Sequence, residues 1–150
     1  MIRVFRHTVI ALTVTVGCAV LTPAVAAAAA QSAAAPCGPS AAACVSLSSQ
    51  RAWLMSGGQV TYGPTPIATG KPGWRTPPGV FRVLWKNKNH RSRQFNNAPM
   101  PNSVFFTSTG IAFHEGSVNA PSHGCVRLSK KAAATFFNTL SVGQVVQVVN

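Results

Sequence analysis

The sequence predicts a mainly β domain with one helix near its C-terminal end. Runs rich in Val, Phe and Ile recur between Gly and Pro residues, a pattern typical of short strands joined by turns. A single stretch, residues 129–140, favours a helix. The length of 150 residues allows one modest domain. We therefore expect one strand-rich domain, preceded by a segment of different character.

The first residues have the pattern of a secretory signal. Arg3, Arg6 and His7 make a basic start, and "TVIALTVTVGCAVL" follows as an apolar run that is short for a membrane span. Small residues then offer several A-x-A cleavage sites. We expect residues 1–30 to be removed by cleavage near Ala26–Ala30, leaving no stable membrane span. An uncleaved membrane anchor is the alternative.

Cys18 raises a second alternative for the leader. "TVGC" loosely resembles the bacterial lipoprotein signal, in which the cysteine becomes the lipidated first residue, although Thr15 stands where that signal prefers Leu. In either case the protein is expected to be exported, and to be periplasmic or associated with the cell wall.

The charge balance is strongly one-sided. Without Arg3 and Arg6, eleven Lys and Arg residues remain against a single acid, Glu115, which gives a net charge of +10. Such a field attracts anionic partners, whether nucleic acid, anionic lipid or an acidic wall polymer. For an exported protein we expect anionic cell-wall polymers and no nucleic acid.

Export also bears on the cysteines, because disulfides persist outside the cytoplasm. Residues 31–44 carry no periodic pattern and are interpreted as a lead-in, in which Cys37 and Cys44 are expected to form a short-range disulfide. Zinc is the alternative for this pair, but no histidine lies near it. Cys125 is then left over, which indicates intermolecular pairing or a reactive thiol.

The domain itself is expected to span residues 45–150. Residues 45–55 alternate so that Val45, Leu47, Trp53 and Met55 would share one face of a strand, and "SGGQ" is a turn before a second strand at "VTYG". Further strands are expected in "GVFRVLW", "SVFFTSTGIAFHE" and "QVVQVV", which are residues 79–85, 103–115 and 144–149.

The predicted helix, "SKKAAATFFNTL", has Ser129 as its N-cap and can bury Phe136, Phe137 and Leu140. Because it follows Cys125 so closely, its dipole is expected to favour the thiolate.

The basic, Asn-rich segment 86–102 is poor in strand formers and long for a connection. It is interpreted either as a solvated surface loop or as a flap over the active site. In the second case its four cations would help to collect anionic substrate: Lys86, Lys88, Arg91 and Arg93.

Candidate chemistry comes from a short set of residues: His114, Glu115, Ser122, His123, Cys125 and Arg127. A cysteine nucleophile needs a base to take its proton and donors to hold an oxyanion. His114 ends an apolar strand and would share a face with Ala112 and Gly116. His123 shares a side with Cys125 only if that segment is extended. Zinc would lack a fourth strong ligand, so no metal is expected, with a three-ligand catalytic site as the alternative.

At "HEGSVNAPSHGCVRLS" the sequence resembles the L,D-transpeptidase catalytic domain family, also called YkuD-like. The family has an upstream histidine and then Ser/Thr-His-Gly-Cys, an aliphatic residue and Arg or Asn. The matching positions are His114, Ser122, His123, Gly124, Cys125, Val126 and Arg127. "VSLSSQRAWLMSGGQV" and "IATGKPGWRTPPGVFRV" are also similar to family segments, so the likeness covers roughly residues 45–149.

This resemblance implies a YkuD-like β-sandwich or barrel of mixed sheets with one helix after the catalytic cysteine. It implies a peptidoglycan L,D-transpeptidase that joins stem peptides by 3→3 cross-links through a cysteine thioester, without a cofactor and as a monomer. L,D-carboxypeptidase trimming of tetrapeptide stems is the alternative within this chemistry. A non-catalytic basic module that binds wall polymers is the alternative outside it.

The resemblance also implies roles for the residues. Cys125 would be the nucleophile and His114 the proton acceptor and donor, oriented by the residue after it through a backbone carbonyl. His123 would be a supporting residue, and the backbone N–H groups of Gly124 and Cys125 would hold the oxyanion. Arg127 would bind a stem carboxylate or brace the loop, and Ser122 would contact substrate. Glu115 departs from the family, in which a small residue is frequent at this position.

Overall fold

The computed structural model describes residues 34–150. The predicted signal and the alternatives at Cys18 lie outside the described residues. Within residues 34–150 the chain forms nine strands and one helix: β1 Ala43–Ser46, β2 Arg51–Ser56, β3 Gln59–Ala68, β4 Gly79–Arg82, β5 Trp85–Ser92, β6 Ala98–Phe105, β7 Ala112–Glu115, β8 Val126–Leu128, α1 Lys130–Thr139 and β9 Val145–Val149. The predicted class, mainly β with one helix after Cys125, is confirmed for this part of the chain.

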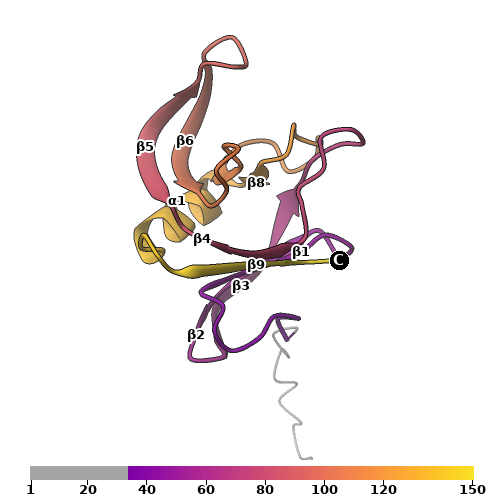
Figure 1. The fold of residues 1–150 in the computed structure, drawn as a ribbon, viewed down its shortest axis with the longest axis vertical. Helices are drawn as coiled ribbons and strands as arrows, with labels where there is room; N and C mark the ends of the chain where they lie inside the picture. The colour runs from indigo at the N-terminus through magenta and orange to yellow at the C-terminus, as the bar shows by residue number, and fades with distance from the viewer. Residues whose placement is uncertain (1–33) are drawn as a thin grey trace, which may run out of the picture. The chain divides into compact units, whose positions relative to one another are not determined.

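The strands follow the order β4-β9-β1-β2-β3-β8-β7-β6-β5. β3 is long enough to serve two sheets, since its first part pairs with β2 and its last residues pair with β8. Most neighbours are antiparallel, but β1 runs parallel to β9 and β7 runs parallel to β8. The sheets are therefore mixed, as predicted. Figure 1 shows the β5–β6 hairpin extending beyond the other strands.

The main core lies between the sheets and α1, which packs against β6, β7 and β8. Its centre is a chain of aromatic rings: Phe113 lies 4.9 Å from Phe106 and 5.1 Å from Phe136, between ring centroids. Phe113 is fully buried. Because side chains alternate along a strand, its neighbours Ala112 and His114 point to the opposite face of β7. The core thereby fixes the direction in which His114 points.

The first predicted strand is in fact two strands. Leu47–Gln50 form a turn between β1 and β2, in which the Ser46 hydroxyl accepts a hydrogen bond from the Ser49 amide at 3.3 Å. Serine side chains compete for backbone groups in this way and so favour turns. As a result Val45 belongs to the main core, whereas Trp53 and Met55 belong to a second cluster. The shared face predicted for these residues is wrong.

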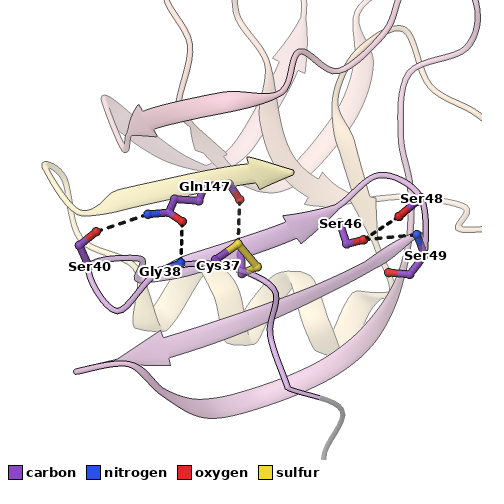
Figure 2. Close-up of a disulfide and its surroundings, with 8 residues drawn as sticks. Cys37, Gly38, Ser40, Ser46, Ser48, Ser49 and Gln147 are labelled. Carbon is purple, nitrogen blue, oxygen red and sulfur yellow. Dashed lines mark hydrogen bonds between the residues drawn. A yellow bond between two sulfur atoms is a disulfide. The ribbon is translucent and has the colours of Figure 1, made fainter. Parts of the chain in front are cut away.

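The predicted lead-in also ends earlier than expected, because β1 begins at Ala43 and lies between β9 and β2. The Cys37–Cys44 disulfide is confirmed, with Cα atoms 5.7 Å apart. Figure 2 shows it beside Gln147 of β9, whose Oε1 accepts the Gly38 amide at 2.9 Å. The bridge joins the segment before β1 to β1 itself, and this hydrogen bond joins it to β9.

Residues 86–102, predicted as a loop, form most of the β5–β6 hairpin instead. Pro99 and Pro101 hide the strand pattern, since proline cannot donate to a ladder. Both prolines lie where β6 extends beyond β7, which pairs only with Val104 and Phe105. The N–H groups that these two prolines lack would therefore have had no partner on the β7 side, and no ladder hydrogen bond is lost there.

A backbone irregularity in β6 re-aims part of this hairpin. Asn102 has a φ of 57°, in the left-handed region that Asn tolerates better than most residues. It interrupts the side-chain alternation, because Met100 and Phe105 are five positions apart yet lie in one buried cluster with Ala112. Met100 in the middle of β6 and Phe105 at its end therefore lie on the same side of β7.

Helix α1 begins and ends as its sequence predicts. The Ser129 hydroxyl accepts the Ala132 amide at 3.3 Å, and Phe136 and Leu140 are buried while Phe137 is partly buried. Lys86 donates from Nζ to the Leu140 carbonyl, where a cation complements the helix dipole. No helix within residues 34–150 has the length and apolar character needed to cross a membrane.

Reduction of the disulfide is expected to destabilise the domain. Closing the eight-residue loop 37–44 restricts the unfolded chain and contributes about 2.5 kcal/mol to the free energy of unfolding. Thermal unfolding with and without dithiothreitol should differ by roughly 10 °C in Tm. Cys125→Ser should show the same loss, because that thiol lies outside the bridge. An unchanged Tm in reductant would contradict a stabilising role for the bridge.

Candidate active site

The predicted site residues line one groove. Its walls come from the β5–β6 hairpin, the loop after β3, the end of β7 and the turn that leads into β8. The lining includes all the candidates from the sequence: His114, Glu115, Ser122, His123, Gly124, Cys125 and Arg127. Segment 86–102 therefore lies beside the candidate residues as part of a hairpin, and its action as a flap stays a prediction.

Cys125 stands immediately before β8 and lines this groove. Within residues 34–150 it is the one cysteine outside the disulfide. It packs against Met100, Phe105 and Ala112. Burial raises the pKa of its thiol above the ordinary value of 9.0, although the Ala112 amide and Arg127 act in the opposite direction. The thiol is therefore protonated at neutral pH.

This outcome differs from the expectation that the helix dipole would favour a thiolate. Strand β8 lies between Cys125 and the first residue of α1, Lys130. Three extended residues span about 10 Å. The effect of a helix terminus falls off within about one turn. The dipole is too far away to offset the cost of burying the thiolate.

His114 lies on the neighbouring parallel strand. Phe113 pairs with Val126 and His114 with Arg127, so one step earlier Ala112 stands opposite Cys125. His114 and Ala112 share a face, which places the imidazole on the same side as the thiol. Its Nδ1 lies 2.7 Å from the Glu115 carbonyl oxygen, which can only accept. Nδ1 therefore carries the proton, and Nε2 is left with a lone pair.

Burial also keeps this imidazole neutral. Desolvation lowers the pKa of His114 from 6.5 to about 4, with smaller lowering by Arg127 and His90 and an opposing effect of the Glu115 carbonyl bond. The resting pair at pH 7 is thus a neutral thiol and a neutral imidazole whose Nε2 can accept a proton. A neutral histidine has the free lone pair that a general base needs, although a pKa of about 4 makes it a weak one.

The turn that carries Cys125 is held by buried hydroxyl groups. Ser122 donates from Oγ to the Cys125 carbonyl and accepts the Gly124 amide at 3.0 Å. Ser122 is almost fully buried and its hydroxyl organises the turn, while its contact with substrate stays a prediction. Gly124 has a φ of 115°, a conformation that side chains disfavour. The segment is therefore bent, and His123 and Cys125 do not lie on one side of an extended strand.

His123 is held in an aromatic cluster. Its ring lies 5.3 Å from Trp74 in an edge-on contact and 4.7 Å from Phe95, between centroids. Phe95 is at the tip of the β5–β6 hairpin, and Trp74 is in the loop after β3. The cluster therefore links three separate segments around the groove. Sequence reasoning missed Trp74 and Phe95, because isolated aromatic residues in loops carry no periodic signal.

Arg127 braces the connection between β7 and β8. Its Nη1 donates to the carbonyls of Ala120 and Pro121 at 3.3 and 3.4 Å. Its side chain also passes so close to Gly116 that a Cβ there would lie 2.9 Å from the Arg127 Cδ. Of the two roles considered for Arg127, the bracing one is visible in these contacts.

The other cations of the groove come from separate segments. Arg91 and Arg93 of the hairpin line it together with Arg75, whereas Lys86 contacts the end of α1 and Lys88 is not among the lining residues. Within residues 34–150 no three His, Cys, Asp or Glu residues converge as metal ligands would. Four arginines and one carboxylate, that of Glu115, line the groove, so positive charge predominates beside the thiol.

Comparison with known proteins places this geometry in a family. The family model described as the L,D-transpeptidase catalytic domain, YkuD, matches residues 40–148. No curated protein matches the chain. Solved structures do: an L,D-transpeptidase from Stackebrandtia nassauensis is 28% identical with a TM-score of 0.68 and covers 72% of this chain. An L,D-transpeptidase from Mycobacterium tuberculosis H37Rv is 25% identical with a TM-score of 0.68 and covers 75%.

A third similar structure is that of an L,D-transpeptidase in complex with imipenem, with 27% identity, a TM-score of 0.63 and cover of 70% of this chain. The matches span 54%, 59% and 56% of those three chains, so this chain spans little more than half of their length. The predicted YkuD-like fold is confirmed by these likenesses.

The titration of His114 is a direct test of the site. NMR should give its ring a midpoint near pH 4, because burial penalises the imidazolium. The unfolded chain then binds more protons than the folded chain between pH 4 and 6.5, so the free energy of unfolding should fall as the pH falls through that window. His114→Gln should remove this part of the acid sensitivity. A midpoint near 6.5 would contradict the buried, neutral base.

Proposed function

The chain belongs to the L,D-transpeptidase catalytic domain family, and from this premise we propose that it forms 3→3 cross-links between peptidoglycan stem peptides through a cysteine thioester. One observation carries the mechanism: the Nδ1 proton of His114 is held by the Glu115 carbonyl, which leaves Nε2 free on the face that carries the Cys125 thiol. The arginines that line the groove around this pair suit a substrate with carboxylates.

In the first step the Cys125 sulfur attacks the carbonyl of the third-position diamino acid in a tetrapeptide stem. The thiol proton passes to Nε2 of His114, a C–S bond forms and the carbonyl electrons move onto oxygen. When the carbonyl re-forms, the C–N bond to the terminal D-alanine breaks. The leaving amine takes the proton from His114, and the stem remains bound as a thioester.

In the second step the side-chain amine of another stem attacks the thioester. Its proton passes to His114 Nε2, the new C–N bond forms, and the C–S bond breaks. The departing sulfur recovers the proton from His114, which restores the neutral pair. If water attacks instead, the same residues give an L,D-carboxypeptidase that trims stems, which is the alternative reaction.

The charge that develops on the carbonyl oxygen needs hydrogen-bond donors. The family resemblance implies this role for the amides of Gly124 and Cys125. The Gly124 amide already donates to Ser122 Oγ at 3.0 Å. The Cys125 amide is therefore proposed as the principal donor from this turn. His123, held by Trp74 and Phe95, supports the wall of the groove beside it.

The same proposal includes the cellular setting. An exported, monomeric protein in the periplasm or at the cell wall would meet stem peptides there, and its basic surface would attract anionic wall polymers. Lipid attachment at Cys18 is the alternative to a cleaved signal. With either a cleaved signal or a lipid anchor, the proposed function involves no nucleic acid and no cofactor.

The reaction is tested with a disaccharide-tetrapeptide and product masses. A cross-linked dimer that has lost one D-alanine supports transpeptidation. A tripeptide monomer as the only product would show that the enzyme trims stems instead.

Imipenem, which is bound in one of the similar structures, should add one adduct at Cys125 and none to Cys125→Ala. Absence of an adduct on the folded protein, with salt-sensitive polymer binding retained, would favour the non-catalytic basic module.

Substitution of the base should abolish most turnover. His114→Gln is expected to lower kcat by about 100- to 10,000-fold, because it removes the group that carries the proton in both steps. Glu115→Gln is the matched control on the adjacent residue. It should stay within about threefold of the parent, because Glu115 orients His114 through its backbone carbonyl. A large loss in Glu115→Gln would show that its carboxylate takes part.

The groove cations should act on substrate affinity. Arg93→Gln is expected to raise KM about threefold for stems with free carboxylates, and less for amidated stems or at high salt. Lys88→Gln makes the same charge change on the same hairpin but away from the groove lining. An equal effect of both substitutions would indicate a general surface field rather than recognition in the groove.

A further inference from the structure

We propose that Thr76 is a positioning residue that aims the backbone N–H of Cys125 at the substrate oxyanion. This inference rests on the proposed function and assigns a role to a residue outside the His-Gly-Cys segment. Thr76 lies in the loop between β3 and β4, 49 positions before the nucleophile.

The Thr76 hydroxyl is buried beneath the catalytic turn. The residue is 2% exposed, and its Oγ1 donates to the Gly124 carbonyl at 2.7 Å. The same oxygen accepts the Gly70 amide at 3.0 Å. A buried hydroxyl that both donates and accepts has its direction fixed, because turning it would leave one partner unsatisfied.

The bond to Gly124 determines where the next amide points. In a trans peptide the carbonyl oxygen and the amide hydrogen point in opposite directions. The Gly124 carbonyl and the Cys125 N–H belong to one peptide unit. Since Thr76 holds the carbonyl toward the buried side, the N–H of Cys125 points away from it, toward the side on which the thiol lines the groove.

Glycine makes this peptide unit easy to misalign. With a φ of 115°, Gly124 occupies a region open to glycine and little else, and it lacks a side chain to restrict neighbouring torsions. Ser122 fixes the peptide unit before Gly124 through its amide, and fixes the Cys125 carbonyl after it. Thr76 binds the peptide unit between these two, which joins Gly124 to Cys125 and carries the proposed oxyanion donor.

Thr76 is itself held in place by tight packing. A Cβ at Gly70 would lie 1.8 Å from the Trp74 carbonyl oxygen and 2.8 Å from the Thr76 nitrogen, so only glycine permits this approach. Residues beside Gly70 bond to the catalytic loop: the Ser122 amide donates to Thr69 at 2.9 Å, and the Lys71 amide donates to the Ser122 carbonyl at 3.0 Å. The loop that holds Thr76 is thus anchored to the turn that Thr76 orients.

The test compares two reactions of Cys125 in the full chain. Imipenem acylates the thiol through a carbonyl whose oxygen becomes an oxyanion, whereas iodoacetamide alkylates it at a saturated carbon where none forms. Thr76→Val keeps the shape and removes the hydroxyl, Thr76→Ser restores it, and Thr65→Val changes a buried threonine of β3 as a control. Thr76→Ala replaces the valine variant if thermal unfolding shows that valine prevents folding.

We expect Thr76→Val to slow acylation by about 10- to 100-fold, a part of the effect of losing an oxyanion donor, with alkylation within about twofold of the parent. Thr76→Ser and Thr65→Val should match the parent in both reactions. Equal acylation in Thr76→Val, or an equal slowing of both reactions, would overturn the role of Thr76. Failure of the parent itself to be acylated at Cys125 would instead overturn the proposed function.

Discussion

The parallel pairing of β7 with β8 is the constraint on which the site depends. It sets His114 and Cys125 on one face of adjacent strands, on the side opposite the buried Phe113. Parallel strands need a long connection, and here ten residues without regular structure separate Glu115 from Val126. Their polar groups find partners in Ser122 within the connection and in Arg127 and the loop after β3 outside it. The connection that the topology requires is thereby made rigid.

Burial then sets the protonation of the pair. The same packing that orients the two side chains removes water, which disfavours the imidazolium and the thiolate alike. A neutral resting pair leaves the proton transfer to the moment of attack, when the carbonyl oxygen gains charge. The donors around that oxygen are therefore as important to this site as the base. The positive groove supplies attraction over a longer range, since four arginines and a single carboxylate line it.

The β5–β6 hairpin shows how local rules give way to tertiary context. Its Asn and Pro residues are poor strand formers, yet the pairing is regular on both sides of Asn102. The hairpin extends past β7, so its prolines lose no hydrogen bond to that strand. Aromatic contacts stabilise both ends of the hairpin. Trp85 stacks on Phe105 at its base with centroids 3.7 Å apart, and Phe95 meets His123 at its tip.

The sequence by itself determined the mainly β class, the helix with its Ser129 cap, the disulfide and the family motif around Cys125, because each depends on residues close together in the chain. It did not divide β1 from β2 or find the hairpin, since turn chemistry and edge positions overrode the strand pattern. Only the tertiary structure brought Thr76, Trp74 and Phe95 to the catalytic turn and raised the pKa of the Cys125 thiol. Those features depend on burial and on contacts across the chain, which composition and spacing do not encode.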